Sequence, residues 1–287
     1  MENIYLIGDL KLRISNKKIL DLIPSAFGKF LLSLDEQENF SIECKKISRA
    51  QFEESKKKKN KTKKKEYGIY QNFFFLDKES IIVKQEFNKR KIKVFYASDL
   101  VWELIDNYNN LGFVTEKKIL SNLSFWCNQL CVYNNRIILH GSGLIKDKQA
   151  YIFLAMDNGG KTTLIKRNRN HRIINDDQIF YSIKNHQVFA YATPFGRLSD
   201  GPGSAPVAAF FYINKSKRFS IKKRNYKGLI NSFWMDNYET FASLPKDLKK
   251  KAFKLISDIS MSVPIFELHA DHGNIDWDQV DKVLKNT

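Results

Sequence analysis

The segment YIFLAMDNGGKTTL, residues 151–164, constrains the fold of this chain more than any other part of the sequence. YIFLA predicts a strand, MDNGG a turn and KTTL the start of a helix. Gly160, Lys161 and Thr162 match the end of the phosphate-loop pattern G-x-x-x-x-G-K-[ST], whereas Ala155 stands at its first glycine. Unpaired N–H groups and the helix dipole attract anions to such a turn. Lys161 would then reach the β- and γ-phosphates and Thr162 would bind Mg²⁺.

Two adjacent acids, Asp176 and Asp177, follow the predicted strand at residues 172–174. The helix after the loop should lead back to this strand as a parallel neighbour of the loop strand, which would bring the acids beside the loop. One carboxylate would hold Mg²⁺, and the other would orient or deprotonate an attacking hydroxyl. Considered alone, the pair is also typical of an ordinary acidic turn.

His140 lies in IILHGSG, at the end of the strand expected just before the loop strand. An imidazole at this position would ligate a metal or contact a phosphate. A histidine with a purely structural role is the alternative.

These pieces, in this order, resemble the HPr serine kinase family, which shares an ATP-binding core with phosphoenolpyruvate carboxykinases. The resembling segments are LHGSGLI, YIFLAMDNGGKTTL and HRIINDDQIF, followed by ATPFGRLSDGPGSAPVAAFFYI and the C-terminal ISMSVPIFELHADHGNIDWDQVDKVL. The resemblance covers residues 120–285. It departs from the family loop at Ala155 and at Asp157, whose carboxylate would lie close to phosphates.

The resemblance implies a role for each candidate residue. Those expected to bind the ATP phosphates and Mg²⁺ are Asn158, Gly159, Gly160, Lys161, Thr162 and Thr163. Asp176 would be the base for the accepting hydroxyl and Asp177 a metal ligand, or the reverse. His140 falls where carboxykinases have a metal-ligating histidine. Arg197 would steady the transferred phosphoryl group, because a guanidinium suits phosphate oxygens; a surface arginine is the alternative.

The chain is expected to have a mixed α/β fold. Residues 1–98 predict a small antiparallel β-rich domain, interrupted by a lysine-rich loop at 55–66. Residues 99–287 predict a P-loop kinase-like ATP-binding domain, beginning with helices at 98–112 and 115–133. Alternating strands and helices follow, ending in a helix from residue 246, a strand at 264–269 and a last helix.

The favoured function is therefore an ATP- and Mg²⁺-dependent kinase that phosphorylates a hydroxyl. The acceptor would be a Ser or Thr of a protein or peptide, or a small molecule. The formal net charge of +17 suits an acidic partner. The second hypothesis is a catalytically weak nucleotide-binding module acting through a partner. The third is a nucleic-acid-binding protein that uses the lysine run.

Three cysteines and the absence of a recognisable secretory segment predict a cytoplasmic protein. Cys127 and Cys131 lie four residues apart, so they would share one buried face of a helix. No second Cys or His pair completes a zinc site with them. No apolar run is long enough for a membrane span.

Overall fold

The computed structural model describes residues 2–15, 25–33, 40–46, 70–75, 82–87, 91–96, 124, 127–155, 159–237, 241, 244, 246–271 and 274–286. The chain divides into two compact units. The first comprises Met1–Tyr5, Leu10–Phe27 and Leu31–Leu130, and the second Leu6–Asp9, Gly28–Phe30 and Cys131–Thr287. The predicted boundary after residue 98, the lysine run at 55–66 and the expected helix at 98–112 lie outside the described residues, as does Asn158.

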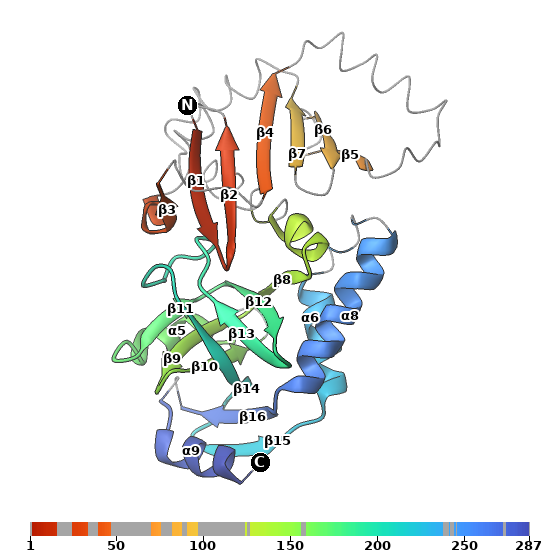
Figure 1. Ribbon diagram of the computed structural model, residues 1–287. Coiled ribbons are helices and arrows are strands. Elements are labelled where there is room, and N and C mark those ends of the chain that lie inside the picture. Colours follow the sequence, from red (N-terminus) through yellow and green to blue (C-terminus); the bar gives the residue numbers. More distant parts are fainter. Residues whose placement is uncertain are drawn as a thin grey trace. The chain divides into compact units, whose positions relative to one another are not determined.

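The N-terminal strands form a seven-stranded sheet in the order β3-β1-β2-β4-β7-β6-β5 (Figure 1). They are β1 (Glu2–Ile7), β2 (Leu10–Ser15), β3 (Leu31–Leu32), β4 (Phe40–Lys46), β5 (Tyr70–Phe75), β6 (Ile82–Phe87) and β7 (Lys91–Tyr96), with the 3₁₀ helix η1 (Ser25–Phe30) before β3. Apolar residues alternate along β2, where Leu10, Leu12 and Ile14 are buried.

This first sheet is mixed, so the prediction of an antiparallel sheet is wrong at its centre. β4 pairs in parallel with both β2 and β7. The β5–β6 and β6–β7 pairs are antiparallel, as expected. Parallel pairing needs a long return connection, and both central pairs have one. Residues 16–39 separate β2 from β4, and β5 and β6 come between β4 and β7.

The second sheet has nine strands and carries the predicted loop. Its order is β11-β9-β10-β14-β13-β12-β8, and β16 pairs with both β14 and β15. The strands are β8 (Arg136–His140), β9 (Ser142–Lys146), β10 (Gln149–Leu154), β11 (Arg172–Asn175), β12 (Gln178–Lys184), β13 (Gln187–Tyr191), β14 (Ser204–Lys215), β15 (Ser220–Lys223) and β16 (Ile265–Ala270). With its helices, the chain is a mixed α/β protein.

Strand β14 changes partner along its length and joins the two halves of this sheet. Its first residue, Ser204, pairs antiparallel with Tyr191 of β13. Further along, Phe210 pairs in parallel with Ile152 of β10 and with Ile265 of β16. Because parallel strands end at the same edge, the carboxyl ends of β10, β14 and β16 lie together.

Strand β11 is not the neighbour of β10 that the sequence predicted, because β9 lies between them. β9 is antiparallel to both strands, so β10 and β11 still run in the same direction. A tight turn at Asp147 and Lys148, both with positive φ, folds β9 against β10. His140 ends β8, which β9 separates from the loop strand along the chain and which lies at the other end of the sheet, next to β12.

Four helices with given bounds pack against the second sheet: α5 (Lys161–Arg167), α6 (Tyr226–Asp236), α8 (Lys246–Ser262) and α9 (Trp277–Lys285). Leu164 and Ile165 of α5 and Val280 of α9 join one apolar core with Phe153 and Phe211 of the sheet. α6 and α8 lie side by side, and both contact β8 (Figure 1). The apolar core that α5 shares with Phe153 holds the start of α5 close to the end of β10.

The helix predicted at 115–133 is confirmed for residues 127–133. Cys127 and Cys131 are both fully buried in it, as their spacing predicted. Burial raises the pKa of the Cys127 thiol well above its usual range, so the thiolate form is suppressed.

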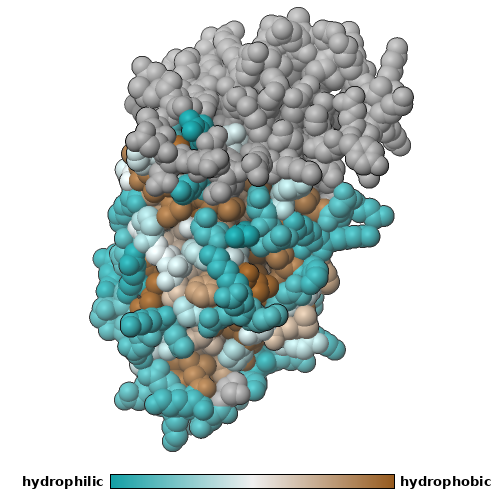
Figure 2. Space-filling model, in the orientation of Figure 1, coloured by the Kyte–Doolittle hydropathy of each residue, from teal (hydrophilic) through white to brown (hydrophobic). Residues whose placement is uncertain are grey.

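Hydrophilic side chains cover most of the described surface on the face shown in Figure 2, with smaller hydrophobic patches between them. Within the described ranges, the large apolar residues that are exposed are Leu31, Tyr226, Met235, Phe253 and Met261. Among the described residues, no helix combines the length and hydropathy needed to cross a membrane.

Candidate functional site

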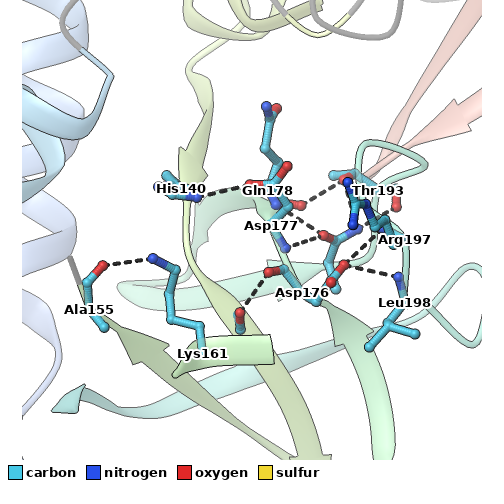
Figure 3. Close-up of polar contacts among 11 residues, drawn as sticks. His140, Ala155, Lys161, Asp176, Asp177, Gln178, Thr193, Arg197 and Leu198 are labelled. Atoms are coloured by element: carbon cyan, nitrogen blue, oxygen red, sulfur yellow. Dashed lines mark hydrogen bonds and ion pairs between the residues drawn. The ribbon is translucent and has the colours of Figure 1, made fainter. Parts of the chain in front are cut away.

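Of the loop after β10, the structure describes Ala155, Gly159 and Gly160. Gly160 precedes α5 with φ 100°, a left-handed conformation that favours glycine. Lys161 begins the helix and is 9% exposed. Its Nζ donates a hydrogen bond of 2.7 Å to the carbonyl of Ala155, the residue at the first glycine position (Figure 3). The Lys161 side chain therefore reaches back from the start of α5 to the residue that follows β10.

The two acids lie in a turn between β11 and β12 that Asn175 holds. The Asn175 Oδ1 atom accepts hydrogen bonds from the backbone N–H groups of Asp177 (2.8 Å) and Gln178 (2.9 Å). Its Nδ2 atom donates to the carbonyl of Thr193 at 2.8 Å. Asn175 is fully buried, so these bonds fix the turn from inside the protein.

Asp176 is buried and points into the loop that follows β13. Its Oδ1 atom accepts hydrogen bonds from the backbone N–H groups of Arg197 and Leu198, each at 2.9 Å (Figure 3). Its backbone carbonyl accepts a bond from the Ser142 hydroxyl at 2.8 Å. Asp176 therefore links β9 to the segment that carries Arg197.

Asp177 faces the opposite way and meets His140. The His140 Nε2 and Asp177 Oδ1 atoms are 2.9 Å apart, and the two side chains are 27% and 52% exposed. Strand pairing produces this contact, because His140 lies opposite Gln178 in the β8–β12 register. The N–H of Gly141 also donates to the Asp177 carbonyl at 2.8 Å. The carboxylate is thus accessible while its backbone is held.

The register of the sheet brings the acid turn level with the end of the loop strand. Ile152 of β10 pairs with Gly143 of β9, and Gly143 pairs with Asn175 of β11. Asp177, two residues after Asn175, is therefore level with Leu154, where the loop begins. Two strand spacings, about 10 Å, separate β10 from β11. A triphosphate bound at the loop could extend across this distance to the acids.

The segment 194–203, which carries Arg197, is anchored at several other points. Asp200 exchanges hydrogen bonds with Ile173, one from each backbone N–H group. Lys29 donates to the Ser199 carbonyl at 2.8 Å, and Arg172 donates to the carbonyl of Pro202. The Arg197 side chain is exposed although its backbone is fixed. The segment can present a guanidinium from a rigid support.

The oxygen donors at this edge suit Mg²⁺ better than a transition metal. No group of three His, Cys, Asp or Glu side chains that could hold a metal occurs within the described ranges. Mg²⁺ does not need such a group, since it uses one or two protein oxygens together with phosphate oxygens and water. The Thr162 hydroxyl, in the first turn of α5, is an oxygen of this kind. The site therefore fits Mg²⁺ carried by a nucleotide.

Sequence reasoning missed Asn175, Ser142 and Thr193, the polar residues that hold the acid turn. Asn175 left a signal, because an asparagine directly before a turn commonly bonds the N–H group two residues later. Ser142 and Thr193 are far from the acids in the sequence and left none. Their contacts arise from the pairing of β9 and β13 with other strands.

No family model matches the chain. No curated protein matches it either. Among solved structures, the chain is similar to the HPr(Ser) kinase/phosphatase from Coxiella burnetii, with 12% sequence identity and a TM-score of 0.30. That match covers 52% of this chain and 88% of the other. A likeness this slight does not establish a function, so the contacts above carry the functional argument.

Proposed function

We propose that this protein is a phosphotransferase that moves the γ-phosphoryl group of Mg-ATP to a hydroxyl. The observation that carries the proposal is the level placement of two features on one sheet edge. These are the loop that ends at Lys161 and the turn that exposes Asp177 beside His140. Phosphoryl transfer needs a phosphate cradle and a group that activates the acceptor, and this edge offers both.

The loop would bind the phosphates through Gly159, Gly160 and Thr163. Asn158, a candidate from the sequence alone, would bind them as well. Lys161 would exchange its bond to the Ala155 carbonyl for bonds to the β- and γ-phosphates. Mg²⁺, held by the Thr162 hydroxyl and the phosphate oxygens, supplies charge neutralisation when bound.

Asp177 is the better candidate for the base, which is the second of the two assignments that the resemblance left open. Its carboxylate is accessible, whereas Oδ1 of Asp176 is committed to two backbone N–H groups. The acceptor hydroxyl would pass its proton to Asp177 as its oxygen bonds to the γ-phosphorus, and the bond to ADP breaks. His140 would orient the Asp177 carboxylate rather than ligate the metal.

Asp176 would position the segment that carries Arg197. With its backbone held by Asp176, the Arg197 guanidinium would stabilise the charge on the transferred phosphoryl group. The acceptor is proposed to be a Ser or Thr of an acidic protein or peptide, or a small molecule. The net charge of +17 supports a negatively charged partner.

The test is transfer of label from γ-labelled ATP to neighbouring gene products, cell extract or the protein itself, with Mg²⁺ and with excess EDTA. We expect label transfer with Mg²⁺ and none with EDTA. Lys161→Met should reduce transfer by about 10²–10³-fold, the size expected when a charge-stabilising donor is removed. Lys166→Met is the matched control, because Lys166 is an exposed lysine of the same helix and should leave transfer unchanged.

A melting temperature raised by Mg-ATP without any label transfer would support a nucleotide-binding module instead. If Mg-ATP neither raises the melting temperature nor gives label transfer, both interpretations of the loop are contradicted.

A further inference from the structure

We propose that Lys215, at the end of β14, is a second phosphate-binding lysine of this loop. The inference rests on the proposed function and adds a binding residue to it. Lys215 is 54 positions beyond Lys161, in a strand with no phosphate-binding motif, so the sequence did not indicate it. The sheet topology and the space around Gly160 bring it to the loop.

Strand β14 runs further than its neighbour β10. The last residue of β10, Leu154, pairs with Tyr212, and β14 continues to Lys215. The last three residues of β14 therefore extend beyond the end of β10. Lys215 is the final residue of the strand and pairs with Ala270 of β16. The Lys215 side chain therefore lies at the edge of the sheet where β10 ends.

The direction of the Lys215 side chain follows from the alternation along β14. Phe211, Ile213 and Lys215 are on one face of the strand, because side chains two apart share a face. Phe211 belongs to the apolar core that includes Leu164 of α5, and Ile213 packs against that core. Lys215 thus continues a row of side chains on the face that α5 covers.

The end of the Lys215 side chain lies near Gly160. Lys215 Cε lies 3.8 Å from the position that a Cβ atom would occupy on Gly160. The ammonium nitrogen is one bond beyond Cε, so the cation lies in the neighbourhood of Gly160. Lys161 is bonded to the Ala155 carbonyl. A polyphosphate bound over Gly160 would meet both lysines.

Two such cations would serve a ligand with several negative charges, which fits the di- or triphosphate part of a nucleotide. Lys215 is exposed, so its contribution will be weakened by salt. It would act by binding, and it need not contact the reacting atoms.

The experiment is isothermal titration of Mg-ADP and of tripolyphosphate into wild type, Lys215→Met and Lys217→Met. Lys217 is also exposed and lies two residues further, after β14 has ended, so it is a matched loss of one positive charge. We expect Lys215→Met to raise the Kd of both ligands about tenfold at low salt, a typical effect of losing a hydrogen bond to a charged group. The difference should shrink at high salt.

Lys217→Met should change either Kd less than twofold. Equal effects of the two substitutions, or no effect of either while wild type binds Mg-ADP, would overturn the role of Lys215 and leave the proposed function standing. If Lys215→Met lowers the melting temperature but not the affinity, Lys215 has a structural role and the inference is wrong. Wild type that binds neither ligand would contradict both proposals.

Discussion

Strands β8 and β12 pair along their length, and a charged cluster lies at each end of the pair. At one end His140 meets Asp177. At the other end Asp9 receives two hydrogen bonds from Arg136, at 3.2 and 3.1 Å, and an ion pair from Lys184 at 3.0 Å. Both clusters centre on one aspartate, yet their surroundings differ.

Asp9 is enclosed by its partners. Its side chain is 15% exposed and faces two permanent cations. Burial alone would raise the pKa of Asp9, but the hydrogen bonds and charges of Arg136 and Lys184 outweigh burial and lower it. Asp177 is 52% exposed and faces an imidazole that is charged only when protonated. The comparison indicates that the first carboxylate stabilises the fold and the second remains available to a ligand.

The largest expected effect tests the second half of this comparison. Asp177→Asn should lower kcat by about 10²–10⁴-fold, the usual contribution of a general base. It should change the free energy of unfolding by less than about 0.5 kcal/mol, because the side chain is exposed. Phosphoryl transfer and urea unfolding measure the two quantities. Asp9→Asn, the control from the other cluster, should keep the wild-type kcat.

The Mg²⁺ dependence of Asp177→Asn separates two roles for this carboxylate. An unchanged Mg²⁺ requirement would fit a base. A large rise in the Mg²⁺ concentration needed for half-maximal rate would instead make Asp177 a metal ligand, as the sequence first suggested.

Substitution of Asp176 should have the next largest effect. Asp176 is adjacent to Asp177, but like Asp9 it is largely enclosed by the protein. Asp176→Ala removes the acceptor of two backbone N–H groups and should cost about 3 kcal/mol of unfolding free energy. Asp176→Asn keeps an oxygen at Oδ1, so it should retain most of the stability and of the activity. Urea unfolding and transfer assays would show this. If Asp176→Asn is as inactive as Asp177→Asn, then Asp176 is the base.

Substitution of Gly196 tests the rigidity of the acid turn, with a smaller expected loss of stability than Asp176→Ala. A Cβ atom on Gly196 would overlap with the side-chain oxygen and amide of Asn175, which holds the turn. Gly196→Ala should therefore cost about 2 kcal/mol of stability, as overpacking usually does, and should lower kcat as well. Gly28→Ala is the control, since nothing lies within 4 Å of its added methyl. Equal melting temperatures for the two variants would show that Asn175 moves freely.

The sequence predicted the local parts of this molecule better than their partners. The strand before Lys161 and the helix that begins at it are formed by neighbouring residues with recognisable patterns, and the structure has both. The position of β9 between β10 and β11 could not be predicted from the sequence. It depends on which strand pairs with which, and apolar alternation fits several pairings equally well.

The same limit applies to the site. Asp176 and Asp177 are adjacent and chemically identical, so the sequence could not tell the buried carboxylate from the accessible one. The difference comes from contacts made across the sheet, to residues 197 and 198 for Asp176 and to His140 for Asp177. Lys215 was missed for the same reason, since only strand pairing brings it to Gly160.

The smallest effect tests the Asp9 cluster through pH. A carboxyl whose pKa is lowered in the folded state stabilises the protein above its ordinary pKa, near ~3.9. That stabilisation is lost as the pH falls through the lowered folded-state value. Asp9→Asn should therefore cost about 1 kcal/mol of unfolding free energy at neutral pH, a modest value because Lys184 and Arg136 are partly exposed. The difference from wild type should disappear in acid, where neither protein carries the charge. Urea unfolding across this pH range measures it, and a penalty that stays constant or grows in acid would show that the Asp9 charge does not stabilise the fold.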